Sequence, residues 1–193
     1  MSFRITHTLL TSWIYSMTSE ERYEEFIKYL NREPTKQTSA MRNGIMFENM
    51  VYAHANGAAI PEDCEWKNGV EGVAETVKGA TFQAALSKDV NIDGIDFHLF
   101  GILDALHAGH IYDVKFSKVY DYGKYFPSTQ HPMYFALCPE AFDFTYVVSD
   151  GEYVYRERYF PEDCEPIEYT IRNFMKSLER QNLVDVYAKN FKM

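Results

Sequence analysis

The sequence has few cysteines and no long apolar run. Its three cysteines, Cys64, Cys138 and Cys164, are far apart and form no C-x-x-C pair, so neither a disulfide framework nor a four-cysteine zinc or iron–sulfur site is expected. No stretch of 18 or more apolar residues occurs, which argues against a membrane span. The first residues carry one positive charge with no long apolar stretch after it, so no secretory signal is predicted. These absences favour a cytoplasmic protein with free thiols.

Two common catalytic motifs and a basic charge balance are also missing. The chain has no G-x-x-x-x-G-K-[ST] loop and no G-x-S-x-G motif, so neither a nucleotide-driven motor nor a serine hydrolase is supported. There are 19 Lys and Arg against 28 Asp and Glu, which gives a net charge of -9. This balance argues against a protein that coats nucleic acid through bulk charge alone. An acidic protein can still act on a polyanion if a local basic strip meets the phosphates.

What the sequence does contain is an apolar fraction of 46% in a chain of 193 residues. These values predict one folded domain that covers 1–193. Helical spacing of apolar residues is found in 20–30, 44–56, 71–87, 129–138 and 165–181. A period of two, with turn residues between the segments, is found in 90–94, 95–104, 111–116, 142–148 and 153–160. The order of these elements predicts an α/β or α+β fold with a mixed sheet.

The segment 101–115 carries the clearest chemistry. Asp104 ends one predicted strand, and Asp113 and Lys115 lie two positions apart on the next. Since side chains alternate across a strand, Asp113 and Lys115 face the same side. The turn at 108–110 folds the two strands into a hairpin that brings Asp104 close to them. Two acids and one lysine are therefore expected to converge on one face of the sheet.

A divalent cation would compensate for this group of charges. Burying the trio without compensation costs on the order of several kcal/mol. The two carboxylates and the backbone carbonyl of Val114 form an all-oxygen ligand set that suits Mg²⁺ or Mn²⁺. Lys115 would then hold the attacking water and stabilise the charge that develops on a phosphate. The alternative is a solvated pair on an exposed face, because D-x-K alone is a short and common pattern.

Two predicted helices and one loop can add residues to this site. Glu48 lies among apolar neighbours and is either a helix-surface residue or an acid delivered to the metal. Gln130 and Tyr134 share a helix face, where they can hold a phosphate or form an ordinary surface with a partly buried tyrosine. Lys118 and Lys124 alternate with aromatic residues, a pattern that can follow a nucleic-acid backbone but also occurs in loops with buried aromatics.

Taken together, these segments resemble the PD-(D/E)xK nuclease superfamily, in the branch of RecB-type nuclease domains and phage lambda-type exonucleases. The resemblance covers about half of the chain and keeps the family's order and spacing. It rests on Gly44-x-x-Phe47-Glu48, Gly101-x-x-Asp104, Asp113-Val114-Lys115 and Gln130-x-x-x-Tyr134. Three departures exist: Leu103 replaces the family's proline, Glu48 stands where RecB-like members often have histidine, and the cysteines of the iron–sulfur relatives are absent.

The resemblance implies a restriction-endonuclease-like fold, in which helices flank a central mixed sheet, and a Mg²⁺- or Mn²⁺-dependent deoxyribonuclease that leaves a 5′-phosphate. Asp104 and Asp113 would bind the metal, Lys115 would be the catalytic lysine, and Glu48 would be an accessory acid. Gln130 and Tyr134 would help to bind DNA.

Four readings of the function stay open at this point. An exonuclease of recombination, repair or phage replication is the leading one, and an endonuclease of the same fold is the nearest competitor. The domain could instead be a non-catalytic DNA-binding or scaffold module. It could also be a nuclease subunit that is active only with a helicase or recombinase partner, and a homo-oligomer is compatible with each reading.

Overall fold

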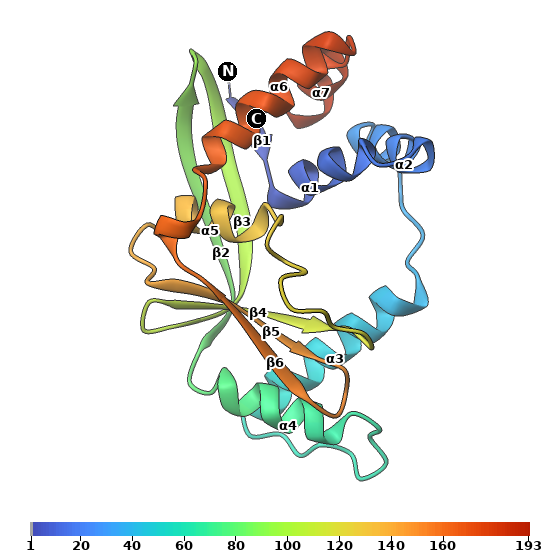
Figure 1. The fold of residues 1–193 in the computed structure, drawn as a ribbon, viewed down its shortest axis with the longest axis vertical. Helices are drawn as coiled ribbons and strands as arrows, with labels where there is room; N and C mark the ends of the chain where they lie inside the picture. The colour runs from blue at the N-terminus through green and yellow to red at the C-terminus, as the bar shows by residue number, and fades with distance from the viewer. Residues whose placement is uncertain (1) are drawn as a thin grey trace.

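A mixed six-stranded sheet forms the centre of the molecule, and seven α-helices flank it in the computed structural model, which describes residues 2–193 (Figure 1). The strand order is β1-β3-β4-β5-β6, and β2 pairs with β3. β1 is parallel to β3 and β4 is parallel to β5, whereas the other pairings are antiparallel. The strands are β1 (Ser2–Ile5), β2 (Thr81–Ile92), β3 (Ile95–His107), β4 (His110–Phe116), β5 (Asp143–Ser149) and β6 (Val154–Tyr159). The predicted α/β class, with a mixed sheet flanked by helices, is confirmed.

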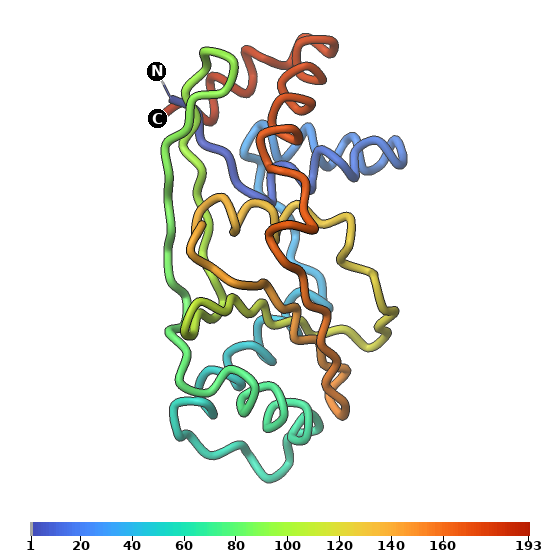
Figure 2. Tube along the Cα trace, turned by 60° about the vertical axis from the view of Figure 1, so that its left-hand side comes forward, coloured from blue at the N-terminus to red at the C-terminus, as the bar shows by residue number. Residues whose placement is uncertain are grey.

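The helices gather at the two ends of the sheet. They are α1 (His7–Ser16), α2 (Glu20–Leu30), α3 (Ser39–Ala55), α4 (Lys67–Thr76), α5 (Gln130–Leu137), α6 (Ile167–Arg180) and α7 (Val184–Phe191), with a 3-10 turn at Pro161–Asp163. Helices α3 and α4 lie at one end, and α1, α2, α6 and α7 lie at the other, where the two chain ends meet (Figures 1 and 2). No helix in the described part of the chain is both long and apolar enough to cross a membrane.

Each end has its own apolar core. The larger one joins α1, α2, α5, α6 and α7 to the sheet through fully buried side chains such as Leu10, Phe26 and Phe174. The smaller one lies under α3 and α4, where Phe47 and other apolar side chains pack on Val114 of β4. Because Val114 faces this core, the neighbouring residues of β4 point to its other side. The smaller core thus fixes the direction in which the acidic and basic side chains of β4 point.

Side-chain caps set the start of three helices, α1, α2 and α3. Ser19 Oγ accepts a hydrogen bond from the amide of Arg22, and α2 follows as predicted over 20–30. Thr38 Oγ1 accepts one from the amide of Met41, so α3 begins at Ser39, five residues before the predicted start at 44. The later elements agree with their predictions to within a few residues: 95–104, 111–116, 129–138, 142–148, 153–160 and 165–181.

The helix predicted over 71–87 is wrong in its second half. Helix α4 ends at Thr76, Gly79 follows in the left-handed region at φ 78°, and β2 begins at Thr81. Three alanines among 80–85 suggested a helix, but antiparallel pairing with β3 along the whole of β2 determines the conformation. Three elements were not predicted at all: β1, α1 and α7.

A buried histidine makes the stability of this fold dependent on pH. His131 is 3% exposed, and its ring stacks on Tyr159 at 4.1 Å between ring centroids. Burial lowers the pKa of His131 to about 4, although the nearby Glu157 carboxylate opposes this. The unfolded chain therefore binds a proton below about pH 6.5 that the folded protein binds only below about pH 4, so stability falls as the pH falls through this window.

We expect the free energy of unfolding to be about 2 kcal/mol smaller at pH 5 than at pH 7 from this residue alone. Chemical denaturation at the two pH values measures the difference. His131→Phe keeps the ring stack and should remove the share of the difference that His131 contributes, while the similar share of His7, whose pKa burial also lowers to about 4, should stay. His107→Gln, at an exposed site, should leave the difference unchanged. An equal pH dependence in all three proteins would contradict the assignment to His131.

Candidate active site

The candidate site lies where β3 loses its strand neighbours on one edge. Strand β1 pairs with β3 over Asp96–Leu99, and β4 pairs with it only over Ala105–His107. The opposite edge of β3 is paired with β2 from Ile95 to Leu106, except at Asp104. Beyond Tyr112, β4 leaves β3 and continues beside β5. The stretch 100–104 of β3 therefore borders a fork between diverging strands, at the centre of the sheet.

Two side chains bond to backbone groups at this fork. The Tyr134 hydroxyl donates a hydrogen bond of 2.6 Å to the carbonyl of Ile102, and the amide of Val114 donates one of 2.9 Å to Oδ2 of Asp104. Gly101 permits this arrangement, because a Cβ at that position would collide with the Tyr134 ring. Asp104 is thus held between the two strands by the backbone of β4.

Asp113 and Lys115 extend from β4 beside Asp104. The Lys115 Nζ lies 2.6 Å from Oδ2 of Asp113, and the Asp113 side chain is 3% exposed against 32% for Lys115. Gln130, at the start of α5, donates a hydrogen bond from its Nε2 to Oδ1 of Asp113. The structure therefore brings together four of the residues singled out in the sequence, from β3, β4 and α5.

Glu48 reaches the same place from α3. Its Oε1 accepts hydrogen bonds from the Tyr52 hydroxyl at 2.6 Å and from Nε2 of Gln83 at 3.0 Å. Gln83 stands opposite Asp104 in the β2–β3 register and has a positive φ of 54°, which interrupts the strand pairing there. Neither Tyr52 nor Gln83 was predicted from the sequence. Tyr52 is four residues after Glu48 on one helix face, which was the available signal, whereas Gln83 lay in the segment misassigned to a helix.

The charges at the fork do not balance. Burial raises the pKa of Asp104 well above its usual value, the carboxylates of Asp113 and Glu48 raise it further, and the Lys115 ammonium opposes them. Burial alone would lower the pKa of Lys115, but Asp113 and Asp104 outweigh this and the net pKa is raised. Three carboxyl groups thus share one amine, and the raised pKa of Asp104 reflects this imbalance.

The chemistry of the oxygen donors fits Mg²⁺ or Mn²⁺. Oδ2 of Asp113 is buried and accepts no hydrogen bond of good geometry within residues 2–193, although it is paired with Lys115. Such an oxygen has a lone pair available for a metal. No group of three His, Cys, Asp or Glu side chains in the described residues forms a ready-made metal cage. The predicted ligand set, Asp104, Asp113 and the Val114 carbonyl, stays a prediction, with water in the remaining positions as is usual for Mg²⁺.

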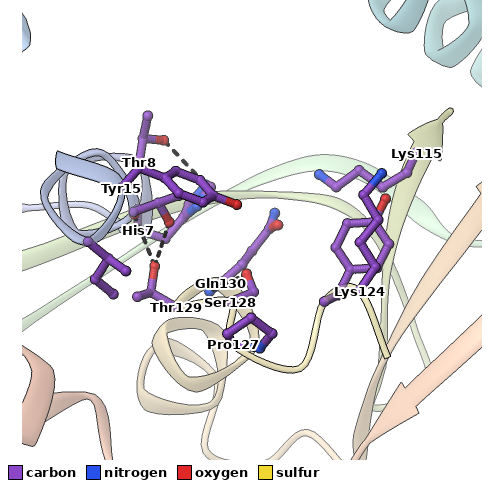
Figure 3. Close-up of a pocket in the computed structure, with 12 residues that line it drawn as sticks. His7, Thr8, Tyr15, Lys115, Lys124, Pro127, Ser128, Thr129 and Gln130 are labelled. Atoms are coloured by element: carbon purple, nitrogen blue, oxygen red, sulfur yellow. Dashed lines mark hydrogen bonds between the residues drawn. The ribbon is translucent and has the colours of Figure 1, made fainter. Parts of the chain in front are cut away.

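A cavity of about 270 Å³ opens beside Lys115 (Figure 3). Lys115 and Lys124 enter it from one side, His7 and Tyr15 from the other, and Gln130 lies between them. Burial lowers the pKa of His7 to about 4, with an opposing effect of Asp113, so this ring is neutral at neutral pH. The predicted Lys124 thus belongs to the cavity, whereas Lys118 is exposed and is not part of its wall.

The loop that forms one wall of this cavity is hydrogen-bonded to Glu157 of β6. This carboxylate is 2% exposed. It accepts hydrogen bonds from the hydroxyls of Tyr120 and Tyr159 and from the amides of Gly123 and Tyr125. Four donors satisfy a buried carboxylate well, so the loop that carries Lys124 is fixed in place.

The predicted DNA-binding roles of Gln130 and Tyr134 stay predictions. Both side chains are nearly buried, at 8% and 2% exposure, and each already has a hydrogen-bond partner in the fork. The i, i+4 spacing correctly placed them on one face of α5, but that face packs on the sheet. In this structure their contacts orient Asp113 and support the backbone of β3.

The comparisons with known proteins support the fold alone. A scan against protein-family models finds no match, and a search of curated proteins finds none similar to this sequence. Among solved structures, the chain is similar to SSO0001, with a TM-score of 0.53 and 15% sequence identity, over 94% of this chain and 77% of that chain. At such a low identity, the similarity indicates a shared arrangement of helices and strands and carries no activity with it.

Proposed function

We propose that this chain is a metal-dependent nuclease that hydrolyses phosphodiester bonds in DNA. One observation supports the proposal above the others: Asp104, Asp113 and Lys115 meet at the fork between β3 and β4, with more carboxylate than amine. Structural ion pairs normally balance their charges, because an uncompensated buried charge is costly. An excess of carboxylates beside a lysine-lined cavity suits a site that recruits a cation and a phosphate.

Each side chain has a separate part in the proposed reaction. Asp104, Asp113 and the Val114 carbonyl would hold Mg²⁺ or Mn²⁺, which when bound would supply Lewis acidity toward the phosphate and its attacking water. Lys115 orients the water and stabilises the charge that develops on the phosphoryl oxygens. Gln130 fixes the orientation of Asp113. Glu48, held by Tyr52 and Gln83, is close enough to raise the pKa of Asp104 and would be an accessory acid.

Cleavage of end-labelled linear DNA and of covalently closed circular DNA tests the proposal. With Mg²⁺ or Mn²⁺ we expect loss of the linear form, and EDTA should prevent it. Cutting of the circle as well would identify an endonuclease instead of an exonuclease. Absence of cleavage by the folded protein would contradict a stand-alone enzyme and favour the DNA-binding module, or a subunit that needs a helicase or recombinase partner. A cytoplasmic role in recombination, repair or phage replication is part of the proposal.

A further inference from the structure

A second cavity adjoins the candidate active site and has no role in the reaction proposed above. It has a volume of about 300 Å³, and its walls include Arg4 of β1, Arg32 after α2, and Phe100 and Ile102 of β3. The first cavity and this one share His7 and Thr8, at the start of α1, so the two are neighbours. We refer to it below as the Arg4–Arg32 cavity.

The charge of the two neighbouring cavities is opposite to that of the whole chain. The chain has 28 acidic and 19 basic residues. The described walls of the two cavities nevertheless contain Arg4, Arg32, Lys115 and Lys124 and no Asp or Glu. Within residues 2–193, neither arginine takes part in an ion pair. Their charges are therefore available to an anion from solution.

Both arginines are held by stacking instead of by carboxylates. The Arg4 guanidinium lies 4.2 Å from the centroid of the Phe100 ring, and that of Arg32 lies 3.7 Å from the centroid of Phe191. Arg32 also donates a hydrogen bond from Nε to the carbonyl of Asn190. A stacked guanidinium keeps N–H groups at its edge free while its plane is fixed, which suits a phosphate.

The position of Arg4 relative to Asp104 matches the spacing of a nucleic-acid strand. Phe100, Ile102 and Asp104 lie on one face of β3, since side chains alternate along a strand. At about 3.3 Å per residue, Phe100 is about 13 Å from Asp104 along the strand. One strand of a duplex rises about 3.4 Å per phosphate along the axis and also winds around it, so a direct distance of this size spans at most about four nucleotides.

From these observations we infer that the Arg4–Arg32 cavity binds a phosphate of the same DNA strand that the active site cuts, a few nucleotides from the cleaved bond. The inference rests on the proposed function and adds a subsite to it. It identifies the ligand as a phosphate, which can belong to the internal backbone or to the 5′ end of the strand.

Binding of labelled oligonucleotides in EDTA, over a series of salt concentrations, tests the inference without cleavage. For Arg4→Gln combined with Arg32→Gln, we expect an affinity loss on the order of tenfold or more and a decrease of about 1–2 in the slope of log affinity against log salt. Arg4→Lys combined with Arg32→Lys should keep most of the slope. The charge-matched control is Lys78→Gln combined with Arg156→Gln, at the α4 end of the molecule, and it should bind like the wild type.

Oligonucleotides with a 5′-phosphate and with a 5′-hydroxyl distinguish the two possible sources of the phosphate. If the loss is equal with a 5′-phosphate and a 5′-hydroxyl, the cavity binds the internal backbone; if it requires the 5′-phosphate, the cavity binds the end. Unchanged affinity and slope in the folded Gln variant would overturn the inference, while wild-type cleavage in Mg²⁺ would leave the proposed function intact. A wild-type protein that neither binds nor cuts DNA would overturn both.

Discussion

Lys115→Ala is expected to lower the rate of DNA cleavage by about 10²–10³-fold, the usual effect of removing one group that stabilises transition-state charge. The reason is the place of the Lys115 ammonium, which lies 2.6 Å from Asp113 and reaches into the cavity beside the fork. The loss should appear mainly in kcat, because Lys115 acts on charge that develops during the reaction. Single-turnover cleavage of linear DNA in Mg²⁺ measures it.

Two further variants make this result specific. Lys115→Arg keeps the charge but not the compact ammonium, and we expect it to restore little activity. Lys78→Ala removes a surface lysine that is paired with Glu75, and its activity should equal that of the wild type. If Lys115→Ala cleaves DNA at the wild-type rate, the fork is not the active site, and any nuclease activity of the chain must be sought elsewhere.

The convergence at the fork could be predicted because it depends on short-range rules. Alternation along a strand places Asp113 and Lys115 on one side, and the turn at 108–110 brings back the strand that carries Asp104. The structure agrees with both steps. The sequence pattern did not predict that the strands diverge. In the structure, β1 and β4 pair with different parts of the same edge of β3.

The residues that were missed depend on contacts between distant parts of the chain. His7 and Arg4 precede the fork by about a hundred positions, and the parallel pairing of β1 with β3 brings them there. A four-residue strand has too short a pattern to be predicted alone. The contact of Tyr134 could not be predicted for the same reason. Its spacing placed it on the correct face of α5, but its hydrogen bond to the Ile102 carbonyl exists only because the strands diverge in the folded sheet.

Asp104→Asn is expected to stabilise the protein while it removes the activity. Burial and the neighbouring Asp113 raise the pKa of this carboxyl, so its ionised form is costly in the folded protein. An amide oxygen can still accept the hydrogen bond of the Val114 amide. We expect the melting temperature to rise by about 2–4 °C, the shift that corresponds to ~1 kcal/mol in a domain of this size. Cleavage should fall by at least about 10²-fold, because a metal ligand is lost.

The response to Mn²⁺ decides whether this carboxylate is a metal ligand or only a structural group. Mn²⁺ at about 100 times its Kd should stabilise the wild type by about 2.7 kcal/mol, and Asp104→Asn by much less. Asp89→Asn changes the charge equally at an exposed site, so it should respond to Mn²⁺ as the wild type does. Two results together would give Asp104 a purely structural role, as a link between β3 and β4. They are a lower melting temperature for Asp104→Asn and no stabilisation of the wild type by Mn²⁺. A variant that gains stability and loses both the Mn²⁺ response and cleavage would establish that the excess charge at the fork is kept for function, because stability alone would select against it.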